Sequence, residues 1–394
     1  MFTINVLDNL SPKGLNLFDP KRYKIGADME DPDVILVRSR KLHDHAFMKQ
    51  LKAVGRAGVG TDNIPVDALT DRGVPVFYAP GANANAVKEL VLAAMLLGYR
   101  HLDEARFFVR QLKQKDNNLL TQEVEANKKK FVGHEISGKV LGVIGLGHIG
   151  VLIANAAHSL GMKVLAYDPY LTVDNALSLK PGIKKVNDLR EVLSNSDIIT
   201  LHVPFCNETK HLINEESIQL IKKDSLLLNF SREQIVDEIA VLKQLETKSL
   251  LGYITDFPSL NLVEHPKVLS FPHLGASTIE AEENSANMVV RNICNYLEYG
   301  IIERSVNFQD TFISSTSTKS CRRFVVINHN MPGMIAHVTQ CISQLEYNIE
   351  NMVNTSKANV ALNIIDVSGP IEQENILLQS FESIPGVIRV RSLL

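Results

Sequence analysis

The chain has 394 residues, and its 41 Lys and Arg against 44 Asp and Glu give a net charge of -3. At roughly 150 residues per domain, this length predicts two or three domains and excludes a mini-protein held together by disulfides. The balanced charge leaves no electrostatic footprint for nucleic acid or for an anionic membrane, so we expect neither as a partner.

The amino terminus and the cysteines indicate the compartment. The opening MFTINVLDNLSPKG lacks the features of a signal peptide, and no uncharged apolar run reaches the ~18 residues of a membrane-spanning helix. We therefore expect a soluble, cytoplasmic protein. The four cysteines lie far apart without a C-x-x-C motif, which favours reduced thiols with packing roles over a disulfide framework or a zinc site. No metal is expected.

The first hundred residues alternate short apolar runs with polar helical stretches, which is typical of βαβ units around a parallel sheet. From Ala82 to about Lys113 apolar residues recur every three or four positions, and this predicts one long helix. The charged stretch EVEANKKKF that follows is predicted to be solvated helix and connection. The apolar runs are INVL at 4–7, VILV at 34–37, LKAVG at 51–55 and VPVFY at 74–78.

A second and more regular series of apolar runs begins at Lys139. Five runs with helical stretches between them predict a doubly wound α/β domain. VLSFP at 268–272 is predicted either as an edge strand or as a return to the first domain, and the helical pattern from Thr278 to about Tyr299 suits a helix that carries the chain back. The five runs are VLGVIG, MKVLAYD, DIITLHV, DSLLLNF and LLGYITDF.

Around residues 307–320 the composition shifts to NFQDTFISSTSTKS, which predicts a linker because it is rich in Ser and Thr without apolar periodicity. Beyond it the predicted order of elements is βαββαβ, the order of a small ferredoxin-like domain. The predicted strands are 322–328, 347–355, 359–366 and 387–393, and the predicted helices are 332–345 and 373–383.

The strongest local motif is VLGVIGLGHIG at 140–150, which places Gly145-x-Gly147-x-x-Gly150 between a strand and a helix. Glycines at this spacing allow a tight turn and a close approach of a pyrophosphate to the helix N-terminus. Asp168 ends the next strand, where a carboxylate binds the ribose hydroxyls of NAD and repels the 2′-phosphate of NADP. These features favour an NAD site over a structural glycine-rich turn without a nucleotide.

Three loops follow the later strands at the edge where ligands bind in open α/β sheets. Arg232, directly after an apolar strand, can bind a carboxylate bidentately, whereas most arginines are salt-bridged surface residues. His273 has the sequence context of a proton-transfer residue, with a hydrogen-bonded loop histidine as the alternative. The loops are His202 to Pro204, Asn229 to Arg232 and Phe271 to Thr278.

Together with Val236-Asp237, these motifs resemble the D-isomer-specific 2-hydroxyacid dehydrogenases, and Arg38-Ser39-Arg40 and the segment Gly55 to Asn63 are similar to the D-3-phosphoglycerate dehydrogenases within that family. The resemblance implies an α/β protein with a discontinuous flavodoxin-like substrate-binding domain and a Rossmann-type NAD-binding domain, with the active site between them. It also implies an ACT-like regulatory domain. The implied boundaries are 1–90 plus 275–306 for the substrate-binding domain, 91–274 for the NAD-binding domain, 307–320 for the linker and 321–394 for the ACT-like domain.

The implied activity is NAD-dependent oxidation of D-3-phosphoglycerate to 3-phosphohydroxypyruvate, the first step of serine biosynthesis, in a homodimer or homotetramer. Arg232 and His273 match the family's catalytic Arg and His. Arg38, Ser39 and Arg40 match residues that contact the substrate's phosphate and carboxylate, although arginines at a strand end can also be simply solvated. The implied cofactor-binding residues are Gly145, Gly147, His148, Ile149, Gly150, Asp168, Val203, Phe230, Ser231, Arg232, Asp256, His273 and Gly275.

In the last domain, Asn328-His-Asn330-x-Pro332-Gly333 and Asn348-Ile349 resemble the ACT site that binds serine as a feedback inhibitor. Asn330 and Asn348 match the asparagines that contact the ligand. The alternative is a helix N-terminus opened by Pro332 with asparagine caps, which needs no ligand.

Two positions depart from the family pattern. Leu260 or Asn261 stands where a glutamate normally pairs with the catalytic histidine, and Asp256 and Glu264 are the nearest acids. Glu233 follows the catalytic arginine in place of the usual glycine. Two alternatives therefore stay open: a dehydrogenase for another 2-hydroxy acid, such as a 2-hydroxyglutarate-like acid, and a regulatory NAD- and amino-acid-binding protein that has lost catalysis.

Overall fold

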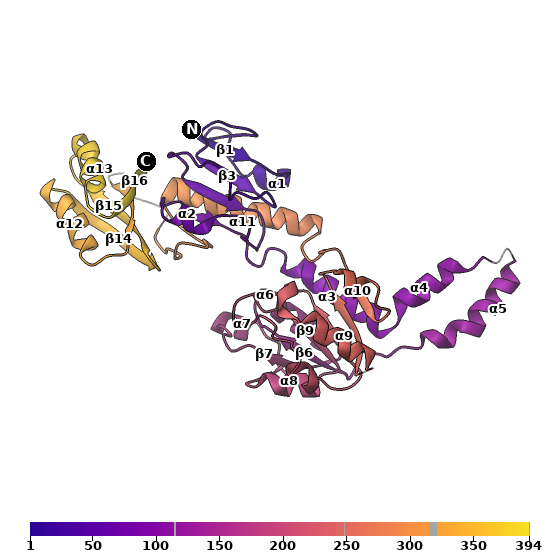
Figure 1. Ribbon diagram of the computed structural model, residues 1–394. Coiled ribbons are helices and arrows are strands. Elements are labelled where there is room, and N and C mark those ends of the chain that lie inside the picture. The colour runs from indigo at the N-terminus through magenta and orange to yellow at the C-terminus, as the bar shows by residue number, and fades with distance from the viewer. Residues whose placement is uncertain (114–115, 248, 315–320, 394) are drawn as a thin grey trace. The chain divides into compact units, whose positions relative to one another are not determined.

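The structure is a computed structural model that describes residues 1–113, 116–247, 249–314 and 321–393. The chain forms two compact units, the first made of Met1–Asn83 and Ile279–Leu394 and the second of Ala84–Thr278 (Figure 1). Within these described ranges, no helix combines the length and the apolar character needed to cross a membrane.

The first unit contains a five-stranded parallel sheet in the order β2-β1-β3-β4-β5, the flavodoxin-like order. Its central strands are buried on both faces, as expected of a parallel sheet covered by helices. The strands are β1 (Phe2–Val6), β2 (Tyr23–Gly26), β3 (Val34–Val37), β4 (Ala53–Arg56) and β5 (Val76–Phe77), with short helices α1 (Pro12–Leu15) and α2 (Val66–Thr70).

The helix predicted from Thr278 is confirmed as α11 (Ile279–Tyr299). Its apolar side packs on the five-stranded sheet, where Val289 and Ile293 share one core with Leu36. Glu280 and Glu282 stand in its first turn, where carboxylates interact favourably with the helix dipole. The first turn of α11 therefore carries two acidic side chains beside the five-stranded sheet.

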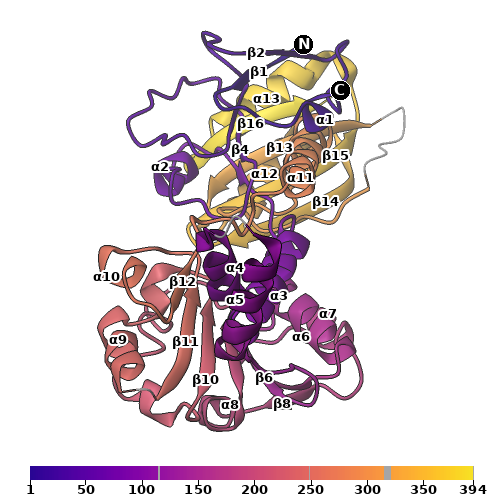
Figure 2. The same cartoon turned by 90° about the vertical axis from the view of Figure 1, so that its right-hand side faces the viewer.

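The second unit contains a seven-stranded parallel sheet in the order β12-β11-β10-β9-β6-β7-β8, and its strands β12, β11 and β10 are seen side by side in Figure 2. The strand order reverses between β6 and β9. Such a reversal marks the ligand-binding crevice of a Rossmann-type sheet. The doubly wound domain and the edge strand at 268–270 are thereby confirmed. The strands are β6 (Val140–Ile144), β7 (Lys163–Tyr167), β8 (Lys184–Val186), β9 (Ile198–Leu201), β10 (Ser225–Asn229), β11 (Leu250–Thr255) and β12 (Val268–Ser270), and the helices between them are α6 (His148–Ser159), α7 (Val173–Leu177), α8 (Leu189–Asn195), α9 (Glu238–Glu246) and α10 (Leu260–Val263).

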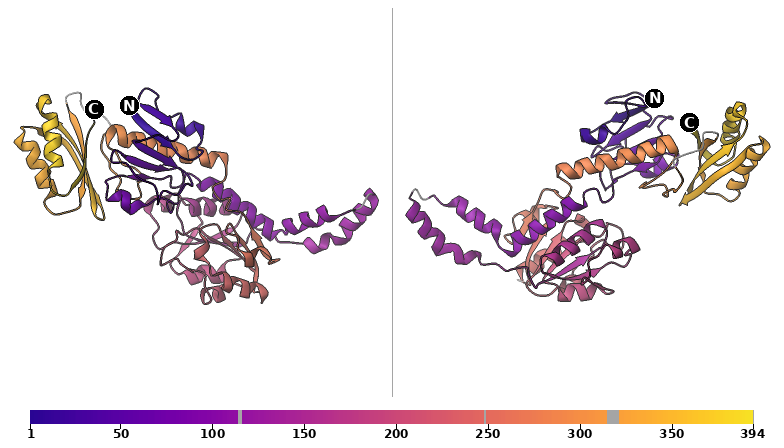
Figure 3. Two further views of the ribbon diagram at one scale, coloured as in Figure 1. Left: turned by 45° about the horizontal axis from the view of Figure 1, so that its top comes forward. Right: turned by 180° about the vertical axis from the view of Figure 1, so that it is seen from behind.

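The single long helix predicted from Ala82 to Lys113 is wrong. α3 (Ala84–Tyr99) ends before His101, which adopts a left-handed φ of 49°, and α4 (Leu102–Gln111) starts after it. A left-handed residue cannot continue a right-handed helix. α4, α5 (Asn117–Asn127) and the 3-10 helix η1 (Lys128–Phe131) form an arm that extends from the sheet of its own unit (Figure 3).

The predicted βαββαβ order at the carboxyl terminus is confirmed. The four strands form an antiparallel sheet in the order β14-β15-β13-β16, the ferredoxin-like arrangement, with the two helices packed on one face. On the other face, Val325 and Ile327 share the core that contains Tyr296 of α11. The elements are β13 (Arg322–His329), α12 (Met334–Gln344), β14 (Asn348–Lys357), β15 (Val360–Ser368), α13 (Glu374–Glu382) and β16 (Val387–Leu393).

The predicted linker begins as packed structure. Phe308 and Thr311 are buried, and the Asn307 side chain donates a hydrogen bond to the Val74 carbonyl at 2.9 Å. Residues 315–320 lie outside the described residues. The division into substrate-binding, NAD-binding and ACT-like domains stays a prediction.

Candidate functional site

The glycine motif forms the turn between β6 and α6. Gly145 has a φ of +95°, and a Cβ there would lie 2.7 Å from the carbonyl carbon of His202. A Cβ on Gly150 would lie 1.9 Å from the Gly145 carbonyl oxygen, whereas a Cβ on Gly147 would meet nothing within 4 Å. The motif therefore packs tightly on the protein side and leaves open space at Gly147.

The N-terminus of α6 suits an anion. Gly147 is its N-cap and offers no side chain to the first-turn N–H groups, so these donors are left for a ligand. His148 and Ile149, the predicted pyrophosphate neighbours, are the first residues of the helix. The turn thus fits the pyrophosphate of a dinucleotide.

Asp168 follows β7 beside this turn. Its carboxylate accepts the N–H of Leu146 at 2.7 Å and the N–H of Tyr170 at 2.8 Å. These bonds fix the carboxylate next to the glycine turn while its oxygens keep further lone pairs for ribose hydroxyls. The donor set and the space at Gly147 both fit NAD.

A second loop follows β10 and carries Ser231 and Arg232. The buried Asn229 holds both residues, because its Oδ1 accepts the Ser231 N–H at 3.2 Å and its Nδ2 donates to the Arg232 carbonyl at 3.0 Å. The Ser231 hydroxyl donates to the carbonyl of Val203, another predicted cofactor residue. The Arg232 guanidinium is half-buried and donates to the Ser231 carbonyl at 2.8 Å, which leaves most of its donors available.

The next loop, after β12, carries His273. Asp256 is 2% exposed and its two carboxylate oxygens accept the N–H groups of Leu274 at 2.7 Å and Gly275 at 2.8 Å. The His273 N–H donates to the Asp256 carbonyl at 3.1 Å, and His273 has a left-handed φ of 57°. Asp256 therefore fixes the backbone that carries the histidine.

The His273 imidazole is exposed and meets the ring of Phe257 edge to face, with 5.2 Å between ring centroids. Across the part of the chain that the structure describes, no carboxylate oxygen pairs with this imidazole. Leu260 is 92% exposed, Asn261 donates to Glu238 at 2.8 Å, and the Asp256 carboxylate is engaged by the loop. The glutamate that the family pattern predicts is thus not replaced by a neighbouring acid.

Two further residues of this edge have packing roles. The His202 ring is hydrogen-bonded to the Thr200 hydroxyl at 2.8 Å, and burial lowers the pKa of His202 to about 3, so the ring is neutral. Phe230 is buried, and its ring lies 6.2 Å from that of Phe271, centroid to centroid. Both rings stiffen the loops that carry the polar residues.

The first unit holds the second group of predicted residues. Arg38, Ser39 and Arg40 follow β3, and their three backbone N–H groups all donate to Oδ2 of Asp8, at 2.6, 2.8 and 2.9 Å. Burial alone would raise the pKa of Asp8, but the hydrogen bonds from Arg40, Arg38 and Ser39 outweigh it and hold the pKa below its usual value. Asp8 is therefore a carboxylate that anchors this loop.

Two neighbours complete the loop. Asn63 donates to the Arg40 carbonyl at 2.8 Å. Arg56 ends β4 in register with Val37, one residue before Arg38, so a third guanidinium stands at the same sheet edge. The sequence analysis named Asn229 only as the first residue of a loop and did not identify Asp8; the available signal was a polar residue directly after an apolar run.

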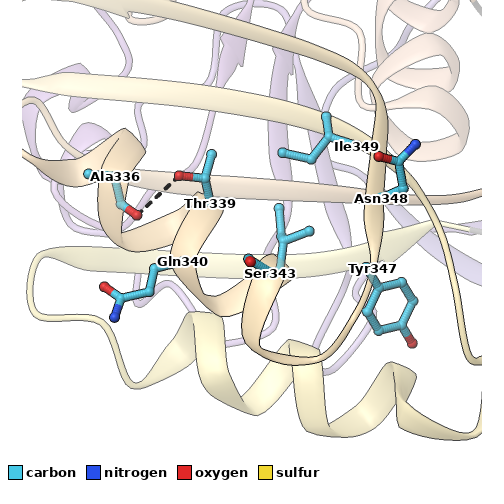
Figure 4. A pocket seen from close by; sticks show the side chains of 8 residues that line it. Ala336, Thr339, Gln340, Ser343, Tyr347, Asn348 and Ile349 are labelled. Atoms are coloured by element: carbon cyan, nitrogen blue, oxygen red, sulfur yellow. Dashed lines mark hydrogen bonds between the residues drawn. The ribbon is translucent and has the colours of Figure 1, made fainter.

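Asn330 and Asn348 do not meet within one chain. Asn330 lies at the turn of the β14–β15 hairpin, where its backbone N–H donates to the Asn359 carbonyl and its Nδ2 donates to the Ala358 carbonyl. Asn348 is the first residue of β14 and lies in register with Ser368 of β15. The ten residues of β14 separate them by roughly 30 Å. Figure 4 shows Asn348 beside Thr339, Gln340 and Ser343 of α12, around a groove of about 480 Å³.

Comparison with known proteins agrees with this geometry. Residues 102–275 match the family model "D-isomer specific 2-hydroxyacid dehydrogenase, NAD binding domain". The D-3-phosphoglycerate dehydrogenase of Bacillus subtilis is 36% identical over 363 residues, which are 87% of this chain and 65% of the relative, so the chain spans just under two thirds of that protein.

Two further matches extend over most of both chains. The D-3-phosphoglycerate dehydrogenase of Haemophilus influenzae is 32% identical over 409 residues, covering 99% of this chain and 94% of the relative. The solved 3-phosphoglycerate dehydrogenase of Entamoeba histolytica with bound NAD+ is similar with a TM-score of 0.60 at 26% identity, over 78% of this chain and 98% of that one. The chain therefore belongs to the D-isomer-specific 2-hydroxyacid dehydrogenase family, and its second unit contains the NAD-binding domain of that family.

Proposed function

We propose that this protein oxidises D-3-phosphoglycerate to 3-phosphohydroxypyruvate with NAD, the first step of serine biosynthesis. The observation that carries this proposal is the loop Arg38 to Arg40, in which Asp8 fixes two arginines at one sheet edge. A phosphorylated hydroxy acid needs cationic donors in addition to those that hold its carboxylate. An unphosphorylated substrate of the same family would not need them.

The reaction requires loss of the hydroxyl proton while a hydride leaves C2 of the substrate. NAD, when bound, supplies the hydride acceptor. His273 takes the proton, because its imidazole is exposed on a fixed loop and histidine is the side chain best suited to proton transfer at neutral pH. Arg232 holds the carboxylate with its free guanidinium donors, and Arg38 and Arg40 bind the phosphate.

The cofactor would be held by the elements that fit it. The N–H groups of the first turn of α6 bind the pyrophosphate next to Gly147. Asp168 accepts hydrogen bonds from the ribose hydroxyls, and its charge disfavours the 2′-phosphate of NADP. Val203, Phe230, Ser231 and Gly275 complete the predicted set.

We also propose a homodimer or homotetramer. The arm of α4 and α5 exposes Phe107, Val109 and Leu119, and a second copy would cover these apolar side chains. If serine binds through both Asn330 and Asn348, their separation requires two copies of the carboxyl-terminal domain to form one site. A cytoplasmic location is supported by the free thiols of Cys206, Cys294 and Cys341.

The test is NADH formation by the purified full-length chain with D-3-phosphoglycerate, D-glycerate and D-2-hydroxyglutarate. We expect phosphoglycerate to give the highest kcat/KM, and Arg38→Ala to lower kcat/KM for it while leaving glycerate nearly unchanged. A higher kcat/KM for 2-hydroxyglutarate would assign a different substrate. NAD binding without turnover of any acid would instead indicate a regulatory protein.

A further inference from the structure

The predicted phosphate-binding arginine already has an anionic partner within the chain. Nη1 of Arg38 lies 2.8 Å from Oε1 of Glu282, in the first turns of α11. The Arg38 side chain is 35% exposed and that of Glu282 is 41% exposed, so a ligand from solvent can reach both. The Glu282 carboxylate therefore engages a guanidinium nitrogen of Arg38 that a substrate oxyanion would also use.

Glu282 differs from Asp8, the other carboxylate at this loop. Asp8 accepts three backbone N–H groups on one oxygen, so it is part of the loop's framework. Within the described ranges, Arg38 is the one polar partner of the Glu282 carboxylate. A half-exposed ion pair of this kind contributes little to stability and is cheap to release.

We propose that Glu282 binds the anion-binding edge of Arg38 and competes with the substrate's phosphate for it, so that Glu282 lowers the affinity of this edge for its substrate. The proposal rests on the proposed function in that Arg38 binds the phosphate. A dianionic phosphate on Arg38 would lie within a few ångströms of the Glu282 carboxylate, where like charges repel. Glu282 therefore weakens the binding of every oxyanion at Arg38 and raises KM for the phosphorylated substrate.

The same helix provides a matched control. Glu283, the next residue, pairs with Lys13 at 2.9 Å and, within the described residues, forms neither a hydrogen bond nor an ion pair with the arginine loop. Glu283→Gln removes the same charge from the same turn of α11 and breaks a comparable surface ion pair. Glu282→Gln keeps an oxygen that can accept from Arg38 while it removes the charge, so the orientation of Arg38 is preserved.

The first measurement is steady-state kinetics of the full-length protein with NAD and D-3-phosphoglycerate. We expect Glu282→Gln to lower KM for phosphoglycerate about three- to ten-fold with kcat changed less than two-fold, and Glu283→Gln to leave both within two-fold. An unchanged or raised KM in Glu282→Gln would overturn the proposal, because Glu282 would then be neutral toward Arg38 or needed to position it.

The second measurement separates this inference from the proposed function. Inorganic phosphate is titrated into each protein without substrate, and binding is measured by calorimetry. We expect Glu282→Gln to bind phosphate at least three-fold more tightly than the unmodified chain and Glu283→Gln, and the double variant Arg38→Ala/Glu282→Gln to lose this gain. Equal phosphate affinity in all four proteins would refute the competition even if phosphoglycerate is oxidised. If phosphoglycerate is not oxidised, the proposed function fails, but a gain in phosphate affinity that depends on Arg38 still supports the role of Glu282.

Discussion

The loop of His273 and the loop Arg38 to Arg40 lie in different units of the chain but are built in the same way. In each, one carboxylate accepts consecutive backbone N–H groups, Asp256 from Leu274 and Gly275 and Asp8 from Arg38 to Arg40. The two loops differ in what faces the functional side chain. Arg38 meets the carboxylate of Glu282, whereas the ring of His273 meets that of Phe257.

This difference distinguishes two tasks of acidic residues, which different residues perform in the Arg38 loop. A carboxylate that accepts backbone N–H groups fixes where a loop lies, and a carboxylate beside the functional side chain adjusts the charge and orientation of that side chain. The His273 loop has the first kind and lacks the second in the described residues. The Arg38 loop has both. Substitutions at these carboxylates and at the side chains they hold test whether the two tasks are separable.

The largest effect is expected at Arg232, whose loop is held by the neutral amide of Asn229. Arg232→Ala should lower kcat/KM by about 10² or more, because a charge-assisted bidentate contact to a carboxylate is worth ~3 kcal/mol in a desolvated site. Arg232→Lys keeps the charge but loses the fork and should recover only part of the rate. Near-normal kinetics in Arg232→Ala would remove this residue from the mechanism.

Asp256→Asn tests the framework of the His273 loop. An amide can accept one of the two N–H groups but turns its NH₂ toward the other, so the loop should shift and kcat should fall on the order of 30- to 100-fold. Asp256→Asn is compared with His273→Asn in stopped-flow measurements of hydride transfer. If Asp256→Asn lowers stability but not kcat, the loop position does not depend on this carboxylate.

Asp8→Asn tests the framework of the arginine loop. We expect KM for phosphoglycerate to rise about ten-fold with kcat nearly unchanged, because the charge that binds three N–H groups is lost and the arginines are less well placed. A fall in kcat at constant KM would contradict a role limited to positioning the arginines.

The pH dependence of this effect follows from the lowered pKa of Asp8. A carboxyl group whose pKa is lower in the folded protein contributes stability above its unfolded pKa of about 3.9 and loses it as pH falls through the lower, folded value. The KM ratio between Asp8→Asn and the unmodified chain should therefore be constant from about pH 5 to pH 8. A ratio that changes within this range would assign the effect to another group.

The smallest effect is expected from supplying the carboxylate that His273 lacks. Leu260 is 92% exposed, so Leu260→Glu should fold normally. A carboxylate beside an imidazole favours the imidazolium, so kcat should rise about three-fold and the pH at which oxidation is half-maximal should move upward. Asn261→Glu, which breaks the contact to Glu238, is the companion variant. No change in either profile would show that Phe257 already orients the ring sufficiently.

The sequence predicted the strands that are buried on both faces, and it missed two exposed edge strands, β2 and β8. β9 and β10 are continuous apolar runs, whereas β2 and β8 expose Lys24 and Lys184 and carry little apolar signal. The helix break at His101 has no Gly or Pro to mark it. The separation of Asn330 from Asn348, in contrast, follows from the predicted strand order and could have been derived from it.

For the site, motif and residue type predicted which side chains take part in the chemistry, but not which residues hold them in place. Asp256 was predicted as a cofactor neighbour, and its role in fixing Gly275 depends on where backbone N–H groups point in three dimensions. The pairing of Arg38 with Glu282 joins segments from opposite ends of the chain. No local pattern could reveal either contact.

The most direct test of the central claim is transfer of deuterium from D-3-phosphoglycerate labelled at C2. The purified chain is incubated with NAD and the labelled acid, and the reduced cofactor is examined by mass spectrometry. The proposed oxidation predicts NADH that carries one deuterium on the nicotinamide, formed together with 3-phosphohydroxypyruvate in equal amounts. Reduced cofactor without deuterium, or no reduced cofactor at saturating substrate, would contradict it.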